Sequence, residues 1–413
     1  MVSARIKRNQ RRVASYIGAG IIGGGSPFVP TQPQLVANFT GIPNGTFVQM
    51  GTGNVRAMGR SQHRSGRVRA KNLQFLDSLI YLSTNGVEAA SATLNTLKRA
   101  IEIGGVTTPA LYAGLNSIGI SGSAQALSDI IGSLELPPDT DFFARWEKTL
   151  PLDTNSLIAH ALVGPGTGQG FRTTGASQLL STGLMNSSGT GAGPQFWPNG
   201  IFGVPFSPMS AVAIIADSLG NYREDDNNGA GGGAWARALN DILGSVVPWM
   251  KQSQNGHTFG NASFANAPLQ KTHWQYVTDI FIELSTNSMP TSGTVAERLL
   301  ALQNGWLNLA NGARAIIGPY GKRLRVHFFD MLKRDSYELD ATQRDTRLAY
   351  NAWGAAFADG KADAYYNTDS VVTIPVGSDG IHIAKAVHIQ IAADVIVPGY
   401  TPFLDPFYFP RGE

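Results

Sequence analysis

The chain has 413 residues, and 43% of them are hydrophobic, enough for one large core or for two or three ordinary ones. It contains no cysteine, which excludes disulfides, thiolate metal sites and a cysteine nucleophile, and no apolar run approaches the roughly 20 residues of a membrane-spanning helix. The net charge of +3 conceals an asymmetry, because residues 1–76 carry eleven basic residues and no acid, whereas residues 77–413 sum to −8 with 21 basic and 29 acidic residues.

The first 76 residues predict a basic, extended arm. A basic head at residues 5–12 precedes a Gly-, Pro-, Thr- and Asn-rich stretch with little apolar periodicity. Residues 18–23, Gly-Ala-Gly-Ile-Ile-Gly, match the dinucleotide-binding pattern G-x-G-x-x-G. However, the residues before this match are charged, Pro27 prevents a following helix, and no acid precedes Asp77 to hold a ribose. A dinucleotide-dependent enzyme that uses this pattern is therefore the less favoured alternative.

A second basic cluster covers residues 56–71, with a basic residue every two to four positions and no acid between them. An unpaired face of this density repels itself, and an anionic polymer would relieve the repulsion. A merely solvated basic face and an export signal at Arg11-Arg12 are the alternatives. The favoured prediction is nucleic-acid binding through phosphates, without sequence recognition. Its residues are Arg5, Lys7, Arg8, Arg11, Arg12, Arg56, Arg60, Arg64, Arg67, Arg69 and Lys71.

The body is predicted to begin with helices over residues 77–163. Apolar residues between 87 and 101 recur at helical spacing. Shorter helices are expected at 109–118, 123–135, 139–149 and 154–163. Residues 164–233 are rich in Gly, Ser, Thr and Asn and predict a loop-rich, projecting region, in which residues 208–219 form an apolar helix.

A second helical part is expected over residues 234–370. Thr294 and Glu297 have the spacing of a capping box and mark a helix start, while Gly305 and Gly312 should weaken that helix or split it. Residues 371–413 are predicted to form strands and an aromatic C-terminal arm, because Ile and Val alternate with other residues after residue 380.

Side chains that could carry catalysis form no recognised constellation in the sequence. His382 and His388 share a face of the predicted strand, but roughly 20 Å of strand separates them, too far for one metal ion. Residues 318–323, Gly-Pro-Tyr-Gly-Lys-Arg, lack the leading glycine and the Ser or Thr of a phosphate-binding loop. No nucleophile elbow of the form G-x-S-x-G occurs. The sequence therefore predicts no enzyme, no cofactor and no metal, with a site assembled only in space left as an alternative.

Four features occur together: a basic arm, an acidic body of short helices with late strands, long Gly/Ser/Thr-rich loops and an aromatic tail. In this combination the chain resembles viral coat proteins, and its character is nearest to the helix-rich coats of small double-stranded RNA viruses. The resemblance implies an α+β fold with a helix-rich shell domain, late β-strands and extended arms at both ends. A jelly-roll or another shell fold is the alternative.

The same resemblance implies a structural function. Copies of the chain would assemble with one another into an icosahedral shell, in the virion after assembly in the host cytoplasm. The basic N-terminal segment would contact the packaged genome, with RNA favoured. A cellular nucleic-acid-binding scaffold is the alternative, and it would show the same salt-sensitive binding without closed particles.

Overall fold

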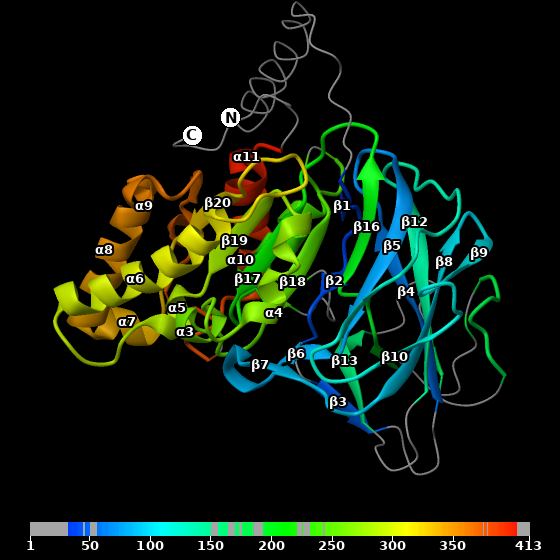
Figure 1. Ribbon diagram of the computed structural model, residues 1–413. Coiled ribbons are helices and arrows are strands. Elements are labelled where there is room, and N and C mark those ends of the chain that lie inside the picture. The colour runs from blue at the N-terminus through cyan, green and yellow to red at the C-terminus, as the bar shows by residue number, and fades with distance from the viewer. Residues whose placement is uncertain are drawn as a thin grey trace, which may run out of the picture.

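The computed structural model has two parts that lie side by side (Figure 1). Antiparallel strands dominate the first half of the chain, and a parallel sheet with helices dominates the second. The mixed α+β class predicted from the sequence is confirmed. The residues described are 32–43, 46–49, 56–149, 156–163, 170–172, 176–183, 185, 193–220, 225, 232–242, 244–374, 376–377 and 379–402.

The first part is a sandwich of two antiparallel sheets around an apolar core. Leu73 and Phe75 from one sheet meet Ile101 and Phe142 from the other, and all four side chains are fully buried. One sheet has the order β1 (Gln34–Leu35), β16 (Gly200–Pro205), β5 (Ala70–Ser78), β11 (Gln125–Leu127). The other has the order β10 (Ile118–Ile120), β8 (Asn95–Ile103), β12 (Asp141–Thr149), β4 (Arg56–Arg64), β14 (Gly170–Arg172), and β9 (Val106–Ala110) pairs with β8.

Smaller pairings complete this part. The hairpin β6 (Ile80–Leu82) and β7 (Glu88–Ala90) turns through a 3-10 segment, η1 (Thr84–Gly86). A three-stranded sheet has the order β15 (Gly193–Gln195), β13 (Ser156–Val163), β3 (Thr46–Gln49).

The helices predicted within residues 77–163 are wrong, since this region forms strands. In β12, Phe142, Ala144 and Trp146 point into apolar clusters, while Arg145 and Glu147 alternate with them on the other face. The period is therefore two, as in a strand. The polar face of β12 is nevertheless buried, because Arg145 pairs with Glu102 of β8 at 2.8 Å. Residues 139–149 were expected to form a short helix. They form a strand that is buried on both faces, because ion pairs with neighbouring strands neutralise the charges on its polar face.

The second part is built on a parallel sheet that is covered on both faces. Its order is β2 (Thr40–Gly41), β18 (Trp249–Ser253), β17 (Val212–Ala216), β19 (Asp279–Glu283), β20 (Arg325–Phe329), β21 (Ala364–Tyr366). The prediction of an apolar helix over residues 208–219 is wrong, because Val-Ala-Ile-Ile-Ala becomes the fully buried β17. Continuous apolar runs are typical of parallel strands that are buried on both sides.

Two groups of helices cover the two faces of this sheet. Ile280 and Ile282 of β19 share a core with α6 (Val295–Arg314) and α8 (Ala341–Ala355), whereas Phe281 faces α2 (Ala234–Leu239) and a π-helical segment, η4 (Ile391–Ile396). The shorter helices are α3 (Phe259–Ala262), α4 (Pro268–Lys271), α5 (Ser285–Ser288), α7 (Asp335–Leu339), α9 (Phe357–Gly360), α10 (Lys385–Gln390) and α11 (Val397–Gly399). The 3-10 segments η2 (Trp274–Tyr276) and η3 (Thr368–Val371) complete the set. In the described part of the chain, no helix is long and apolar enough to cross a membrane.

The capping-box prediction is confirmed, and the prediction of late strands is wrong. Thr294 and Glu297 form both hydrogen bonds of the box at the start of α6. Gly312 does not split this helix, because its missing side chain makes room for the ring of Phe264. Residues 385–399 are helical, since Ile391 and Ile396 are buried against the sheet face that they cover.

Candidate functional site

A serine, a histidine and an aspartate form a hydrogen-bonded chain at one end of the parallel sheet. Ser218 lies in the turn directly after β17, and its Oγ is 2.9 Å from Nε2 of His382. The other ring nitrogen of His382, Nδ1, is 2.6 Å from Oδ2 of Asp379. This is the order of nucleophile, base and orienting carboxylate that acyl transfer requires.

Asp379 is held as a carboxylate by its own loop. Its Oδ1 accepts the backbone N–H groups of Ile381 and His382 at 3.0 and 2.8 Å. Partial desolvation by itself would raise the pKa of Asp379, but the hydrogen bonds from His382 and Ile381 outweigh it and lower the pKa below its usual value. An ionised Asp379 fixes the tautomer in which His382 donates from Nδ1, which leaves Nε2 free to accept the Ser218 proton.

Residues with hydrogen-bond donors that could serve a developing oxyanion line the same cavity as Ser218. Asn287 follows β19, and its amide donates one hydrogen to Oδ2 of Asp217 at 3.0 Å, leaving the second for a ligand. The backbone N–H groups of Ser218 and Gly256 donate to no acceptor within the described ranges. Gly256, after β18, has a φ of +74°. Such preorganised donors stabilise the negative charge of a tetrahedral intermediate.

A buried pair of carboxyl groups, Asp217 and Glu283, lies next to Ser218 and Asn287 and helps to position them. Asp217 and Glu283 are both fully buried, and the backbone N–H of Asp217 donates to the carbonyl of Glu283 at 3.1 Å. Burial, followed by the neighbouring charge of Asp217, raises the pKa of Glu283 well above its usual value. Burial thus favours the protonated form of Glu283, while Asp217 accepts from Asn287 and from the N–H of Leu219.

The cavity over these groups lies where strand order predicts a ligand. Ser218, Asn255, Asn287 and Arg334 each follow the carboxyl end of a different parallel strand. The chain runs from β17 to β18 on one side and then returns to β19 on the other, and ligands of open parallel sheets bind beside such a reversal. The cavity measures about 370 Å³ and is lined by Ser218, Asn255, Gly256, Asn287, Arg334, Ile381 and His382.

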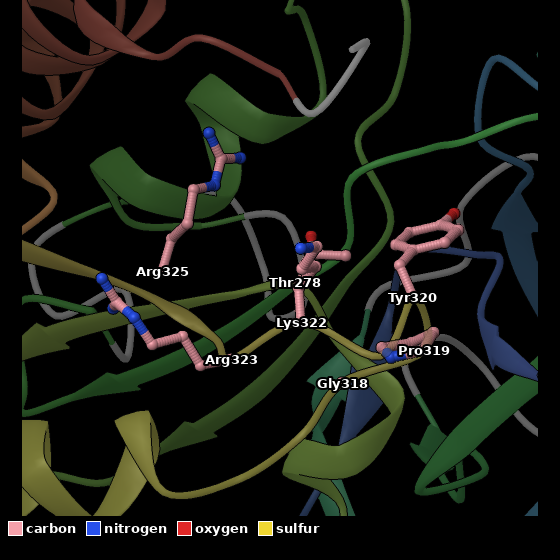
Figure 2. Close-up of a pocket in the computed structure, with 7 residues that line it drawn as sticks. All are labelled: Thr278, Gly318, Pro319, Tyr320, Lys322, Arg323 and Arg325. Carbon is pink, nitrogen blue, oxygen red and sulfur yellow. The ribbon is translucent and has the colours of Figure 1, made fainter. Parts of the chain in front are cut away.

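A second hollow lies at the opposite, amino end of the strands and is no ligand site. It measures about 10 Å³, room for one water molecule at most. Figure 2 shows Arg323 and Arg325 on one side of it and Tyr320 on the other. Arg325 pairs with Asp279 at 2.6 Å and Arg323 with Asp363 at 3.6 Å, so acids of the protein already meet these charges.

The structure separates the residues that were predicted to bind nucleic acid. Arg5, Lys7, Arg8, Arg11 and Arg12 lie outside the described residues, as does the glycine pattern at 18–23. Arg60 is buried and forms two 2.9 Å hydrogen bonds with Glu102, so it is unavailable to a phosphate. The cluster also spans strands of both sandwich sheets. Arg56 and Arg67 are half-buried, and Arg64, Arg69 and Lys71 are exposed.

The two histidines that were considered together have different surroundings. His388 is buried in α10, whereas His382 belongs to the hydrogen-bonded chain with Ser218 and Asp379. Among the described residues, no group of three or more His, Asp or Glu side chains could hold a metal ion.

Comparisons with known proteins return structures and no sequence relatives. No family model and no curated protein matches the chain. It is similar to an active-site mutant of a family two carbohydrate esterase from Clostridium thermocellum, with 13% identity, 90% of this chain and 97% of that chain covered, and a TM-score of 0.34. It is also similar to an acetylxylan esterase from Geobacillus stearothermophilus, with 15% identity, 44% of this chain and 90% of that chain covered, and a TM-score of 0.32. A lipolytic protein of the G-D-S-L family from Veillonella parvula is similar at 12% identity, with 44% of this chain and 93% of that chain covered, and a TM-score of 0.34.

These observations correct the functional prediction. The predictions that the chain is no enzyme, and that it is a structural protein that builds a virion shell around a genome, are wrong, because Ser218, His382 and Asp379 form a hydrogen-bonded chain of the kind that serves acyl transfer, beside a cavity. The resemblance to viral coat proteins in overall style, and the location in a virion, stay predictions that nothing in the structure tests.

Proposed function

We propose that the protein is a serine hydrolase that cleaves acyl esters of small molecules. The observation that carries this proposal is the Ser218–His382–Asp379 chain, whose nucleophile lines a cavity together with Asn287 and Gly256. A volume of about 370 Å³ falls in the range of small-molecule pockets and is too small to enclose a long peptide.

The geometry supplies each step of the reaction. The Oγ of Ser218 attacks the ester carbonyl carbon while Nε2 of His382 takes the hydroxyl proton. The carbonyl oxygen becomes an oxyanion that accepts hydrogen bonds from Ser218 N–H, Gly256 N–H and the Asn287 amide. The intermediate then expels the alcohol, which receives the proton from His382. Water, deprotonated by His382, releases the acid from the acyl-enzyme and regenerates the free Ser218.

Replacement of the nucleophile tests this proposal. The wild-type protein is expected to hydrolyse p-nitrophenyl acetate, and Ser218→Ala should lower kcat by about 10³-fold or more, because the covalent step is lost. A fluorophosphonate probe should add its mass to the wild-type chain and not to the variant. Release of p-nitrophenolate and intact mass spectrometry provide the two readouts.

Ser123→Ala is the matched control, since Ser123 is an exposed serine of the sandwich part. It should retain both hydrolysis and labelling. Equal activity of the wild type and Ser218→Ala, or labelling at another serine, would contradict the assignment of the nucleophile.

A further inference from the structure

Arg334 brings a positive charge to the cavity that the proposed chemistry does not use. It follows β20, and α7 begins at the next residue. The other lining residues, apart from the base His382, are neutral. A guanidinium carries a positive charge and five N–H donors and has no acceptor. Arg334 therefore places one fixed positive charge in the lining of the cavity.

Arg334 differs from the other arginines of its part of the molecule. Among the residues described between 232 and 402, its guanidinium has no ion pair and no hydrogen bond, and its Nε is fully enclosed. Its guanidinium carbon lies 4.9 Å from the ring centroid of Tyr337. The seven others bind carboxylates or backbone carbonyls: Arg237, Arg298, Arg314, Arg323, Arg325, Arg344 and Arg347.

The nearby carboxyl groups of Asp217 and Glu283 form no hydrogen bond with the guanidinium of Arg334 among the described contacts. The positive charge of Arg334 acts through space on Asp217 and Glu283, but no oxygen of either lies within ion-pair distance of it among the described contacts. Burial favours the protonated form of Glu283, and Asp217 is already bound by Asn287 and Leu219. The N–H groups on the two terminal nitrogens of Arg334 are thus left to a ligand.

Resting on the proposed function, we infer that Arg334 selects esters that carry a carboxylate near the scissile bond. A guanidinium binds a carboxylate through two parallel hydrogen bonds, and such charge-assisted bonds are strongest where water is excluded. One positive charge matches one carboxylate, whereas a doubly charged phosphate would call for a second cation, and the lining residues offer none. The substrate class is therefore an acyl ester of a hydroxy acid, such as an acylated acidic sugar.

Two isosteric substrates test this inference. 4-Acetoxybenzoate and 4-acetoxybenzamide share the acetyl ester and the shape, and they differ in charge. The wild-type protein should show a kcat/KM that is about 10- to 100-fold higher for the benzoate, the effect of one charge-assisted bidentate contact. Arg334→Gln should lower kcat/KM for the benzoate by about that factor and leave the benzamide within about twofold. Arg334→Lys should restore part of the preference, because it keeps the charge and loses the fork.

Arg344→Gln is the control, because it removes the same charge from an exposed position on α8. It should leave the ratio of the two substrates unchanged. Competitive inhibition by 4-hydroxybenzoate and 4-hydroxybenzamide gives a readout of binding that is independent of turnover, and Arg334→Gln should weaken inhibition by the benzoate alone. If wild type hydrolyses both substrates equally, or if Arg334→Gln slows both equally, the inference on Arg334 is overturned while the ester hydrolase stands. If neither ester is hydrolysed, the proposed function itself fails.

Discussion

Glu283 shows how a buried group can support a site without touching the substrate. Its carboxyl lies beside that of Asp217, which holds the Asn287 amide at 3.0 Å. Because burial raises the pKa of Glu283 above the usual 4.5, the folded protein keeps a proton that the unfolded chain releases at neutral pH. This linkage stabilises the fold fully below pH 4.5, and the contribution is lost as the pH rises toward the folded-state pKa.

Glu283→Gln should therefore raise the free energy of unfolding at pH 7–8 by on the order of 1–3 kcal/mol and change it little at pH 4, since the amide has no proton to release. Urea denaturation across this pH range measures the difference. Glu135→Gln, at an exposed position, should stay within about 0.5 kcal/mol at each pH. A Glu283→Gln variant that is less stable at pH 7 than at pH 4, each relative to wild type, would show that Glu283 is ionised in the fold.

At the scale of elements, the hairpin β6–β7 of the sandwich part supports the loop that carries Gly256. Gly86 in its turn has a φ of +76°, and a Cβ there would lie 2.1 Å from the ring of the buried His257. The backbone carbonyl of Asn85 accepts from Asn261 at 2.8 Å, which adds a second connection. The position of Gly256, the proposed oxyanion donor, therefore depends on an element from the other half of the chain.

Gly86→Ala should destabilise the protein by about 2 kcal/mol or more and lower kcat toward esters, because His257 must shift and Gly256 with it. Gly104→Ala is the matched control, since Gly104 also has a positive φ but no atom within 4 Å of the added Cβ. It should cost about 1 kcal/mol of backbone strain and leave kcat unchanged. Denaturation and p-nitrophenyl acetate hydrolysis compare the two. Equal effects on kcat would refute the role of the hairpin.

The elements that were predicted correctly are those whose signals are local. The capping box of α6 involves residues three apart and forms as expected. The apolar run 212–216 and the late Ile- and Val-rich stretch were assigned to the wrong element types, because a short apolar run fits a buried strand and a buried helix equally well. Residues 212–216 form a strand because they pair with strands on both sides. The late stretch forms helices because it covers one face of the parallel sheet.

At the scale of the whole molecule, a strand pairing and hydrogen bonds to backbone N–H groups connect the sandwich part to the part built on the parallel sheet. β2 comes from the N-terminal segment yet pairs with β18 in the parallel sheet, and Glu88 of β7 accepts the N–H groups of Leu269 and Gln270 at the start of α4. We therefore expect one cooperative unfolding transition in differential scanning calorimetry, with a calorimetric enthalpy equal to the van't Hoff enthalpy. Two resolved transitions would show that the sandwich and the parallel sheet unfold independently.

The sequence by itself determined the absence of cysteine chemistry, the mixed α and β content and the start of α6, because composition and short spacings suffice for these. The chain of Ser218, His382 and Asp379 could not be predicted from composition or short spacings. Asp217-Ser218 directly after an apolar run and Asp379-x-x-His382 near the C-terminus were the available signals, but Ser218 and His382 are 164 residues apart. The order of parallel strands brings them to one edge of one sheet, and tertiary packing alone also paired Arg60 with Glu102 inside the sandwich. Chemistry that depends on a contact between distant residues is fixed only when the chain is folded.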